Sequence, residues 1–88
     1  RNYKSLLQQW AQKELNETPT YRVVSEKGPD HLKSFEVVAI IGKQRYSTGS
    51  GRSKKEAEQV AARETLALLL AAQDGGGEKD TPCERSGA

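Results

Sequence analysis

The 88-residue sequence contains no methionine and only one cysteine, one histidine, one tryptophan and one phenylalanine. A single cysteine cannot close a disulfide within the chain, which excludes a disulfide-stabilised scaffold and is typical of a reducing compartment. One histidine and one cysteine are too few for a structural zinc site. There is no run of about 18 apolar residues, so we expect no membrane-spanning helix. The first residues also lack the apolar run of a secretory signal. Without a methionine, we expect the chain to be a piece of a longer protein.

Charge is distributed unevenly along the chain. Residues 1–72 carry twelve basic and eight acidic side chains, a net charge of +4, whereas residues 73–88 have a net charge of −2. The second segment has no apolar periodicity and begins with a glycine-rich stretch. We therefore expect one folded domain at 1–72 and a disordered C-terminal tail at 73–88. A modest positive charge does not by itself predict a polyanion partner, because the placement of the cations matters more.

The first apolar pattern predicts a helix from Tyr3 to about Leu15. Its apolar positions recur at three- and four-residue spacing and should share one face: Leu7, Trp10, Ala11 and Leu15. The residues leading to Pro19 should end this helix, because a residue before proline is biased away from the helical region.

Three strands are predicted next, at residues 20–26, 34–41 and 44–50. Alternation places Tyr21 and Val23 on one side of the first strand, with Arg22 and Glu26 on the other. The tight connection at residues 42–43 favours an antiparallel hairpin. The second strand presents one apolar face: Phe35, Val37, Ala39 and Ile41.

A second helix should begin at Ser53, which has the capping-box spacing to Glu56, and should end near Ala72. Its buried stripe is expected to consist of Ala57, Ala61, Thr65 and Leu69, widened by Leu66 and Leu68. The small side chains of Ala57 and Ala61 should allow close approach to a sheet. Two amphipathic helices can together cover the single apolar face of an antiparallel sheet. The predicted fold class is therefore α+β, with the order α-β-β-β-α and both helices packed on one face of a three-stranded antiparallel sheet.

Three cations cluster where the second helix starts: Arg52, Lys54 and Lys55. They oppose the helix dipole, which favours acidic residues in the first turn. A helix N-terminus supplemented with cations is suited to a strong anion such as phosphate. We interpret Gly49 and Gly51 as loosening the approach to this helix. The alternative is that the lysines form an ordinary solvated surface.

Two further surfaces carry polar groups suited to a nucleic acid. The first helix gathers neutral donors and acceptors on one side, namely Ser5, Gln8, Gln9 and Gln12. Such groups suit sugar hydroxyls and base edges, although an ordinary polar helix face would look the same. In the loop at residues 28–31, Gly28 and Pro29 should set the shape while His31 donates into a groove; a plain β-turn is the alternative. No nucleophile or metal-ligand partners accompany His31, which disfavours a catalytic or metal-binding role.

These residues resemble the double-stranded RNA-binding domain over about Tyr3 to Leu70. Residues 49–57, GSGRSKKEA, are similar to that family's glycine-bearing turn followed by Ser-Lys-Lys-x-Ala. Residues 28–31, GPDH, resemble its second RNA-contacting loop, and residues 3–10, YKSLLQQW, its first helix. The combination looks most like the C-terminal domain of bacterial ribonuclease III.

The resemblance implies double-stranded RNA as the partner and a ribonuclease III parent, a Mg²⁺-dependent endonuclease of RNA processing. That parent would be cytoplasmic and homodimeric through a nuclease domain. The acidic nuclease signature is absent from this sequence, so we expect no catalytic site and no cofactor in the chain itself. Glu58 stands where the wider family has a third lysine, so one phosphate contact is not expected.

The resemblance also implies how RNA is held. Domains of this family span about 16 base pairs, contacting two minor grooves and the intervening major-groove phosphates. The implied contacts are made by Ser5, Gln8, Gln9, Gln12, Pro29, Asp30, His31, Arg52, Ser53, Lys54 and Lys55. Two alternatives stay open at this point. One is a protein-interaction domain of the same fold that dimerises through the third strand, and the other is a chain that is itself an enzyme.

Overall fold

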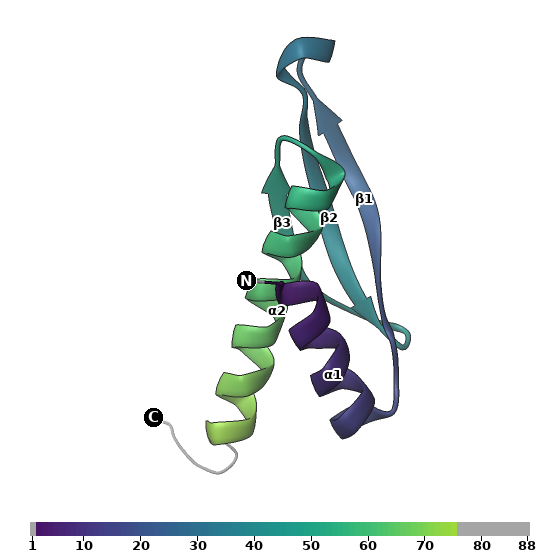
Figure 1. Ribbon diagram of the computed structural model, residues 1–88, viewed down its shortest axis with the longest axis vertical. Helices are drawn as coiled ribbons and strands as arrows, with labels where there is room; N and C mark the ends of the chain where they lie inside the picture. Colours follow the sequence, from purple (N-terminus) through teal and green to yellow (C-terminus); the bar gives the residue numbers. More distant parts are fainter. Residues whose placement is uncertain (1, 76–88) are drawn as a thin grey trace.

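The computed structural model describes residues 2–75, and the predicted order of elements is confirmed (Figure 1). Two α-helices flank three antiparallel strands in the order β1-β2-β3, and a single 3₁₀ turn, η1, links β1 to β2. The elements are α1 (Tyr3–Leu15), β1 (Pro19–Lys27), η1 (Asp30–Leu32), β2 (Ser34–Ile41), β3 (Gln44–Gly51) and α2 (Lys54–Gly75). Helix α2 continues past the expected end at Ala72, and the remainder of the predicted tail lies outside the described residues.

Helix α1 is delimited by two asparagines. The side chain of Asn2 accepts a hydrogen bond from the Ser5 N–H, and Asn16 adopts the left-handed conformation (φ 55°) that ends the helix. The helix therefore stops before the predicted breaker, Pro19, which is buried at the start of β1. Leu15 is 42% exposed, so its predicted place on the buried face is wrong.

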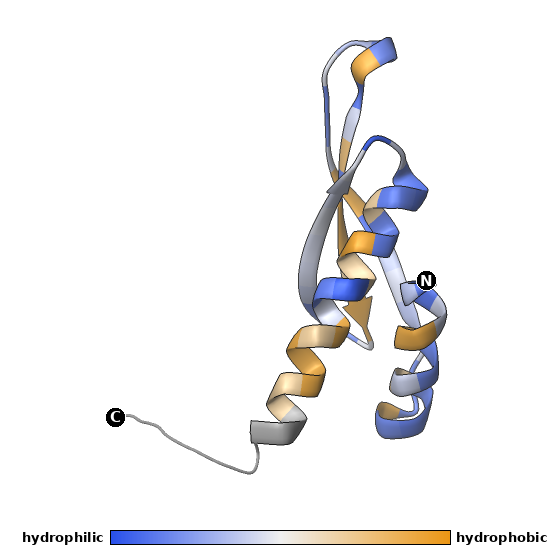
Figure 2. Cartoon of the chain, turned by 60° about the vertical axis from the view of Figure 1, so that its left-hand side comes forward, coloured by the Kyte–Doolittle hydropathy of each residue, from blue (hydrophilic) through white to orange (hydrophobic). Residues whose placement is uncertain are grey.

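The core lies between the sheet and the two helices. One cluster joins Leu7 and Ala11 of α1 to Ile41 and Ala62, with Trp10, Leu66 and Leu69 packed against it. The other joins Val37 and Ala39 of β2 to Ala57 and Ala61 of α2. Figure 2 shows this apolar character along β2 and the lower half of α2. The predicted two-layer packing is thus confirmed.

Two irregularities in the strands change which side chains share a face. In β1, Val24 is an extra residue between the pairs Val23–Val37 and Ser25–Glu36. Because a one-residue shift reverses the side on which later side chains lie, Glu26 pairs with Phe35 on the helix side. The prediction that Glu26 shares the outer face with Arg22 is therefore wrong.

The second irregularity lies in β3 and is compensated by α2. Two residues, Tyr46 and Ser47, lie between the pairs that β3 forms with Val38 and Ile40. The Ser47 N–H donates instead to the hydroxyl of Thr65, which is completely buried on α2 (3.2 Å). This hydrogen bond satisfies a buried polar side chain that the apolar pattern alone does not explain.

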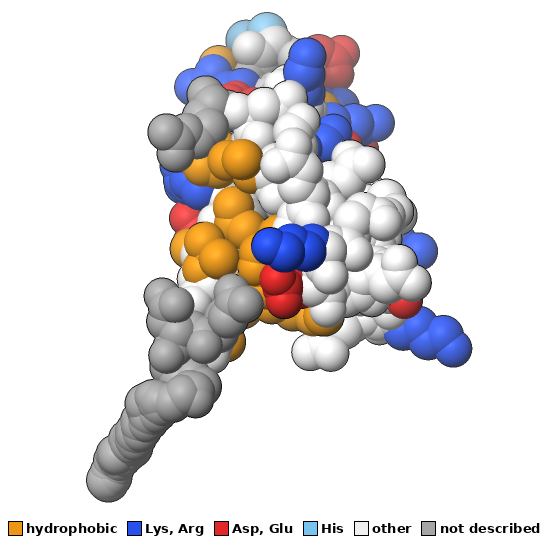
Figure 3. Space-filling view, turned by 60° about the horizontal axis from the view of Figure 1, so that its bottom comes forward, with side chains coloured by type: hydrophobic (Ala, Val, Ile, Leu, Met, Phe, Trp, Pro, Cys, Tyr) orange, Lys and Arg blue, Asp and Glu red, His pale blue; other side chains and the backbone are white. Residues whose placement is uncertain are grey.

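The end of the molecule where α2 finishes is apolar at its surface. Figure 3 shows hydrophobic side chains gathered there, and Leu68 and Leu70 of α2 are 53% and 41% exposed. Leu68 was predicted to widen the buried stripe of α2, and its exposure corrects that prediction. Within residues 2–75, no helix is both long and apolar enough to cross a membrane.

Candidate nucleic-acid interface

The polar face predicted for α1 exists as one surface. Its four exposed side chains line an open depression of about 600 Å³, together with Lys13. They are Ser5, Gln8, Gln9 and Gln12. Gln12 is partly engaged, because its Nε2 donates to the Thr18 hydroxyl (2.6 Å). Lys13 was not predicted, although its position one turn after Gln9 would have placed it on this face.

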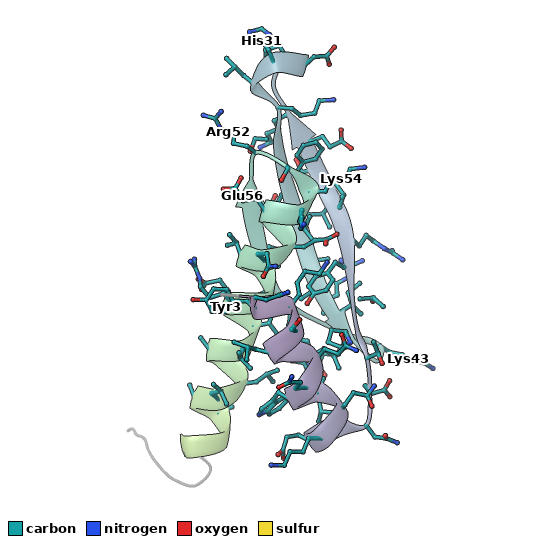
Figure 4. All side chains as sticks on the ribbon, in the orientation of Figure 1. Tyr3, His31, Lys43, Arg52, Lys54 and Glu56 are labelled. Atoms are coloured by element: carbon teal, nitrogen blue, oxygen red, sulfur yellow. The ribbon has the colours of Figure 1, made fainter. Side chains whose placement is uncertain are left out.

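The loop between β1 and β2 places His31 at the far end of the molecule (Figure 4). Gly28 has φ +95°, and a Cβ there would lie 2.5 Å from the Leu32 carbonyl oxygen, so the loop requires glycine. The Leu32 N–H donates to the Pro29 carbonyl (2.9 Å) and closes a 3₁₀ turn, with the same hydrogen bond that closes a β-turn. Asp30 and His31 are both exposed, and the Asp30 carboxylate is 3.9 Å from Lys33 Nζ.

Two side chains cap the start of α2, one from Ser53 just before the helix and one from Glu56 in its first turn. The Glu56 N–H donates to the Ser53 hydroxyl (3.1 Å), as the capping box predicts. The return hydrogen bond differs, because the Glu56 carboxylate accepts from the N–H of Arg52 (2.8 Å) rather than from that of Ser53. Arg52 and Ser53 both belong to the bend before α2, and the Glu56 carboxylate accepts from the N–H of the first of them.

The two glycines before α2 have a different role from the predicted one. A Cβ on Gly49 would overlap the backbone nitrogen of Ala61 and lie 2.7 Å from the Ala57 carbonyl oxygen. A Cβ on Gly51 would lie 2.7 Å from the Ala57 nitrogen. Neither glycine has a positive φ. They let β3 pack directly against α2, so the interpretation that they loosen the approach is wrong.

The three cations at this helix start are exposed to solvent. Within residues 2–75, no carboxylate lies within ion-pair distance of Arg52, Lys54 or Lys55. Lys54 Nζ lies 6.0 Å from the centre of the Phe35 ring, which supports the side chain beside the sheet. Arg52 and Lys54 flank the helix start in Figure 4. Their positive charge therefore remains available to an external anion.

Glu58, the departure from the family's third lysine, forms an ion pair inside the domain. Its carboxylate is 2.6 Å from Lys4 Nζ, so α2 and α1 are linked by charge. Lys4 Nζ also lies 5.2 Å from the centre of the Tyr21 ring. Burial, followed by the negative charge of Glu58, raises the pKa of the Tyr21 hydroxyl to about 12. The glutamate is thus neutralised locally and does not leave a bare negative charge on the surface.

The three predicted surfaces lie one after another along the long axis of the molecule, which measures 46 × 29 × 25 Å. The His31 loop lies at one end, the start of α2 follows it, and α1 lies further along the same axis (Figures 1 and 4). Among the described residues, no three His, Cys, Asp or Glu side chains gather in a way that could hold a metal ion. The arrangement offers dispersed contacts along an extended ligand, with the cations between two polar surfaces.

The family model described as "Double-stranded RNA binding motif" matches residues 3–69, and the chain belongs to this family. The fold of this family supports binding of double-stranded RNA. Among curated proteins, the chain is similar to the Ribonuclease 3 proteins of Myxococcus xanthus, 53% identical over 68 residues, and Rhodopirellula baltica, 48% identical over 68 residues. Each alignment covers 77% of this chain and 26% of the relative, so the chain spans about a quarter of their length.

Solved structures agree with this assignment. Arabidopsis HYL1, described for its implications in miRNA processing, is 37% identical with a TM-score of 0.67. That alignment covers 80% of this chain and 99% of the HYL1 chain. Dicer from Pichia stipitis is 29% identical with a TM-score of 0.60, over 74% of this chain and 31% of Dicer.

Proposed function

We propose that this domain holds an RNA duplex by its A-form shape through three surfaces. The observation that carries the proposal is the placement of exposed cations, without an ion-pair partner among the described residues, between two polar surfaces along one axis. Arg52, Lys54 and Lys55 bind phosphates across the major groove, assisted by the free N–H groups and the dipole at the start of α2. Ser53 belongs to this surface, whereas Pro29 and Asp30 belong to the loop that carries His31.

The two polar surfaces supply discrimination between RNA and DNA. The α1 face enters one minor groove, where its amides and hydroxyl meet 2′-hydroxyl groups as donors and acceptors. His31 enters the next minor groove from the loop. Exposure of all these side chains in the folded domain supports the proposal, because no rearrangement is needed to reach a ligand.

The parent protein is proposed to be a ribonuclease III. Two curated relatives carry that function in their names, and the chain spans about a quarter of each. In such a parent, the domain would position duplex RNA for a homodimeric, Mg²⁺-dependent nuclease domain in the cytoplasm. The coding sequence upstream of Arg1 tests this part, since it should encode the acidic nuclease segment; an unrelated sequence there would contradict it.

The double substitution Lys54→Ala with Lys55→Ala tests the phosphate surface. Affinity for duplex RNA should fall by a similar factor for every duplex sequence, because phosphates carry no sequence information. The slope of log K against log salt concentration should flatten by about 0.9 for each phosphate that the variant no longer neutralises, taking the value for B-DNA as a guide. Fluorescence anisotropy over a salt series measures both quantities.

The control replaces a single cation that lies away from the proposed surface. Lys43→Ala, in the turn between β2 and β3, removes one equivalent charge at the opposite end of the sheet (Figure 4). It should leave the salt slope nearly unchanged. An unchanged slope in the Lys54/Lys55 variant as well would show that these lysines are only solvated.

A further inference from the structure

The first turn of α1 is held by side chains from α2. Gln59 Oε1 accepts hydrogen bonds from the backbone N–H groups of Tyr3 (2.8 Å) and Lys4 (3.2 Å). Gln59 Nε2 donates to Asn2 Oδ1 (3.1 Å), and that oxygen also accepts from the Ser5 N–H (3.1 Å). The N–H groups at a helix start have no partner within their own helix. Here an amide from a second helix supplies most of the cap.

This contact is reinforced by charge. The neighbouring residue on α2, Glu58, pairs with Lys4 (2.6 Å), and Lys4 also contacts the Tyr21 ring. Asn2, Gln59, Glu58 and Lys4 therefore form one polar clamp between the helices. Figure 4 shows Tyr3, the first residue of α1, lying beside α2 at this crossing.

The clamp is adjacent to both parts of the proposed RNA-binding surface. On α2, Glu58 and Gln59 lie four residues after Lys54 and Lys55, so each lies one turn from a proposed phosphate contact on the same side of the helix. On α1, the clamp ends at the N–H of Ser5, the first residue of the polar face. The second turn of α2 thus binds the start of α1, and the preceding turn of α2 is the one proposed to bind phosphate.

Other contacts of α1 are mainly apolar. Its main neighbour is α2, and it touches β1 only at a few residues. Leu7 and Ala11 are buried against Ile41 and Ala62, which sets the side of α1 that faces the core. Hydrogen bonds have defined geometry, so the clamp fixes the first turn of α1, where the polar face begins, more closely than apolar packing does.

We propose that Gln59 is a positioning residue that sets the minor-groove face of α1 in register with the phosphate-binding start of α2. This inference rests on the proposed function of both surfaces. Gln59 itself need not touch RNA. Its loss should therefore weaken the contacts made by α1, which recognise 2′-hydroxyls, and spare those made by Lys54 and Lys55.

Gln59→Met tests the proposal because methionine keeps the length and helix propensity of glutamine but removes all three hydrogen bonds of the Gln59 side chain. Measured well below the melting temperature, its affinity for duplex RNA should fall by about three- to tenfold, the range expected for removal of such hydrogen bonds. Affinity for DNA of the same sequence and the salt slope should not change, so the preference for RNA should fall by the same factor.

Two further variants complete the experiment. Gln44→Met changes an exposed glutamine at the start of β3 and should bind as the wild type does. Gln59→Glu keeps an oxygen acceptor for the Tyr3 and Lys4 N–H groups and should retain most of the preference for RNA.

The outcomes separate this inference from the function on which it rests. A folded Gln59→Met protein with wild-type preference for RNA would overturn the positioning role while leaving the proposed function intact. Equal losses on RNA and DNA with a flatter salt slope would also overturn it, since the phosphate surface would then be affected. A wild-type protein without preference for RNA would overturn the proposed function, and the inference with it.

Discussion

The hydroxyl oxygen of Tyr21 is buried and has no hydrogen-bond partner within residues 2–75. The nearby Glu58 carboxylate adds negative charge, and the two effects together raise the pKa of Tyr21 to about 12. Because both the folded and the unfolded chain keep this hydroxyl neutral below about pH 10, it makes no pH-dependent contribution in the physiological range.

At alkaline pH this tyrosine should destabilise the fold. Between about pH 10 and 12 the unfolded chain releases the Tyr21 proton while the folded domain retains it, so the free energy of unfolding falls as pH rises. We expect Tyr21→Phe to remove about 1–2 kcal/mol of that alkaline loss, a shift reduced from the full linkage value by partial solvent access. Urea denaturation across this pH window measures it.

Tyr46→Phe is the control for this experiment, since it removes the hydroxyl of another partly buried tyrosine that packs on the core. The alkaline loss should be reduced only in the Tyr21 variant. If the wild type and Tyr21→Phe lost stability in parallel, the buried hydroxyl would not be the cause. Near neutral pH, the Tyr21 variant should be at least as stable as the wild type, because an unpaired buried hydroxyl costs free energy.

At the scale of elements, β3 can pack closely against α2 because Gly49 has no side chain. The Cβ of Gly49→Ala would lie 2.7 Å from the Ala57 carbonyl oxygen and would overlap the Ala61 nitrogen, and these backbone atoms cannot move aside alone. We expect this variant to lose about 3 kcal/mol or more of unfolding free energy, at the upper end of overpacking effects. For a domain of this size, the melting temperature should fall by more than about 10 °C.

The neighbouring Ser50 provides the control, because it is exposed and pairs with Glu36 on the outer face of the sheet. Ser50→Ala should change stability by no more than about 0.5 kcal/mol. A Gly49→Ala protein as stable as Ser50→Ala would show that α2 does not pack directly on the backbone of β3.

The elements themselves follow from local patterns in the sequence. Periodicity and capping residues located α1, β2 and the start of α2, because these signals lie within a few residues of one another. The extra residue at Val24 could not be predicted in this way, since valine suits a regular strand and a bulge equally well. The side on which Glu26 lies was therefore wrong, although the strand around it was right.

In the candidate site, too, features within one segment could be predicted and contacts between distant segments could not. The cations at the start of α2 and the polar face of α1 are each visible within one segment, and the structure exposes the members of each set together. The clamp could not be seen, because Gln59 and Tyr3 are 56 residues apart in the chain. The pairing of Glu58 with Lys4 also depends on how α1 crosses α2, which no single segment specifies.

At the scale of the whole molecule, the described part of the chain is an elongated domain that presents three surfaces in succession along its 46 Å length. Such an arrangement suits a long, regular, anionic ligand better than a small molecule. Recognition by shape requires the spacing of the grooves to match the spacing of the surfaces, and A-form and B-form duplexes differ in this spacing and in the 2′-hydroxyl.

The most direct test compares the affinity of the protein for two duplexes of one sequence, about 20 base pairs long, one of RNA and one of DNA, at a fixed salt concentration of about 150 mM. The account predicts clearly tighter binding to the RNA duplex, by about tenfold or more, since the DNA lacks both the groove geometry and the 2′-hydroxyl contacts. Equal affinity for the two duplexes would contradict recognition of A-form RNA.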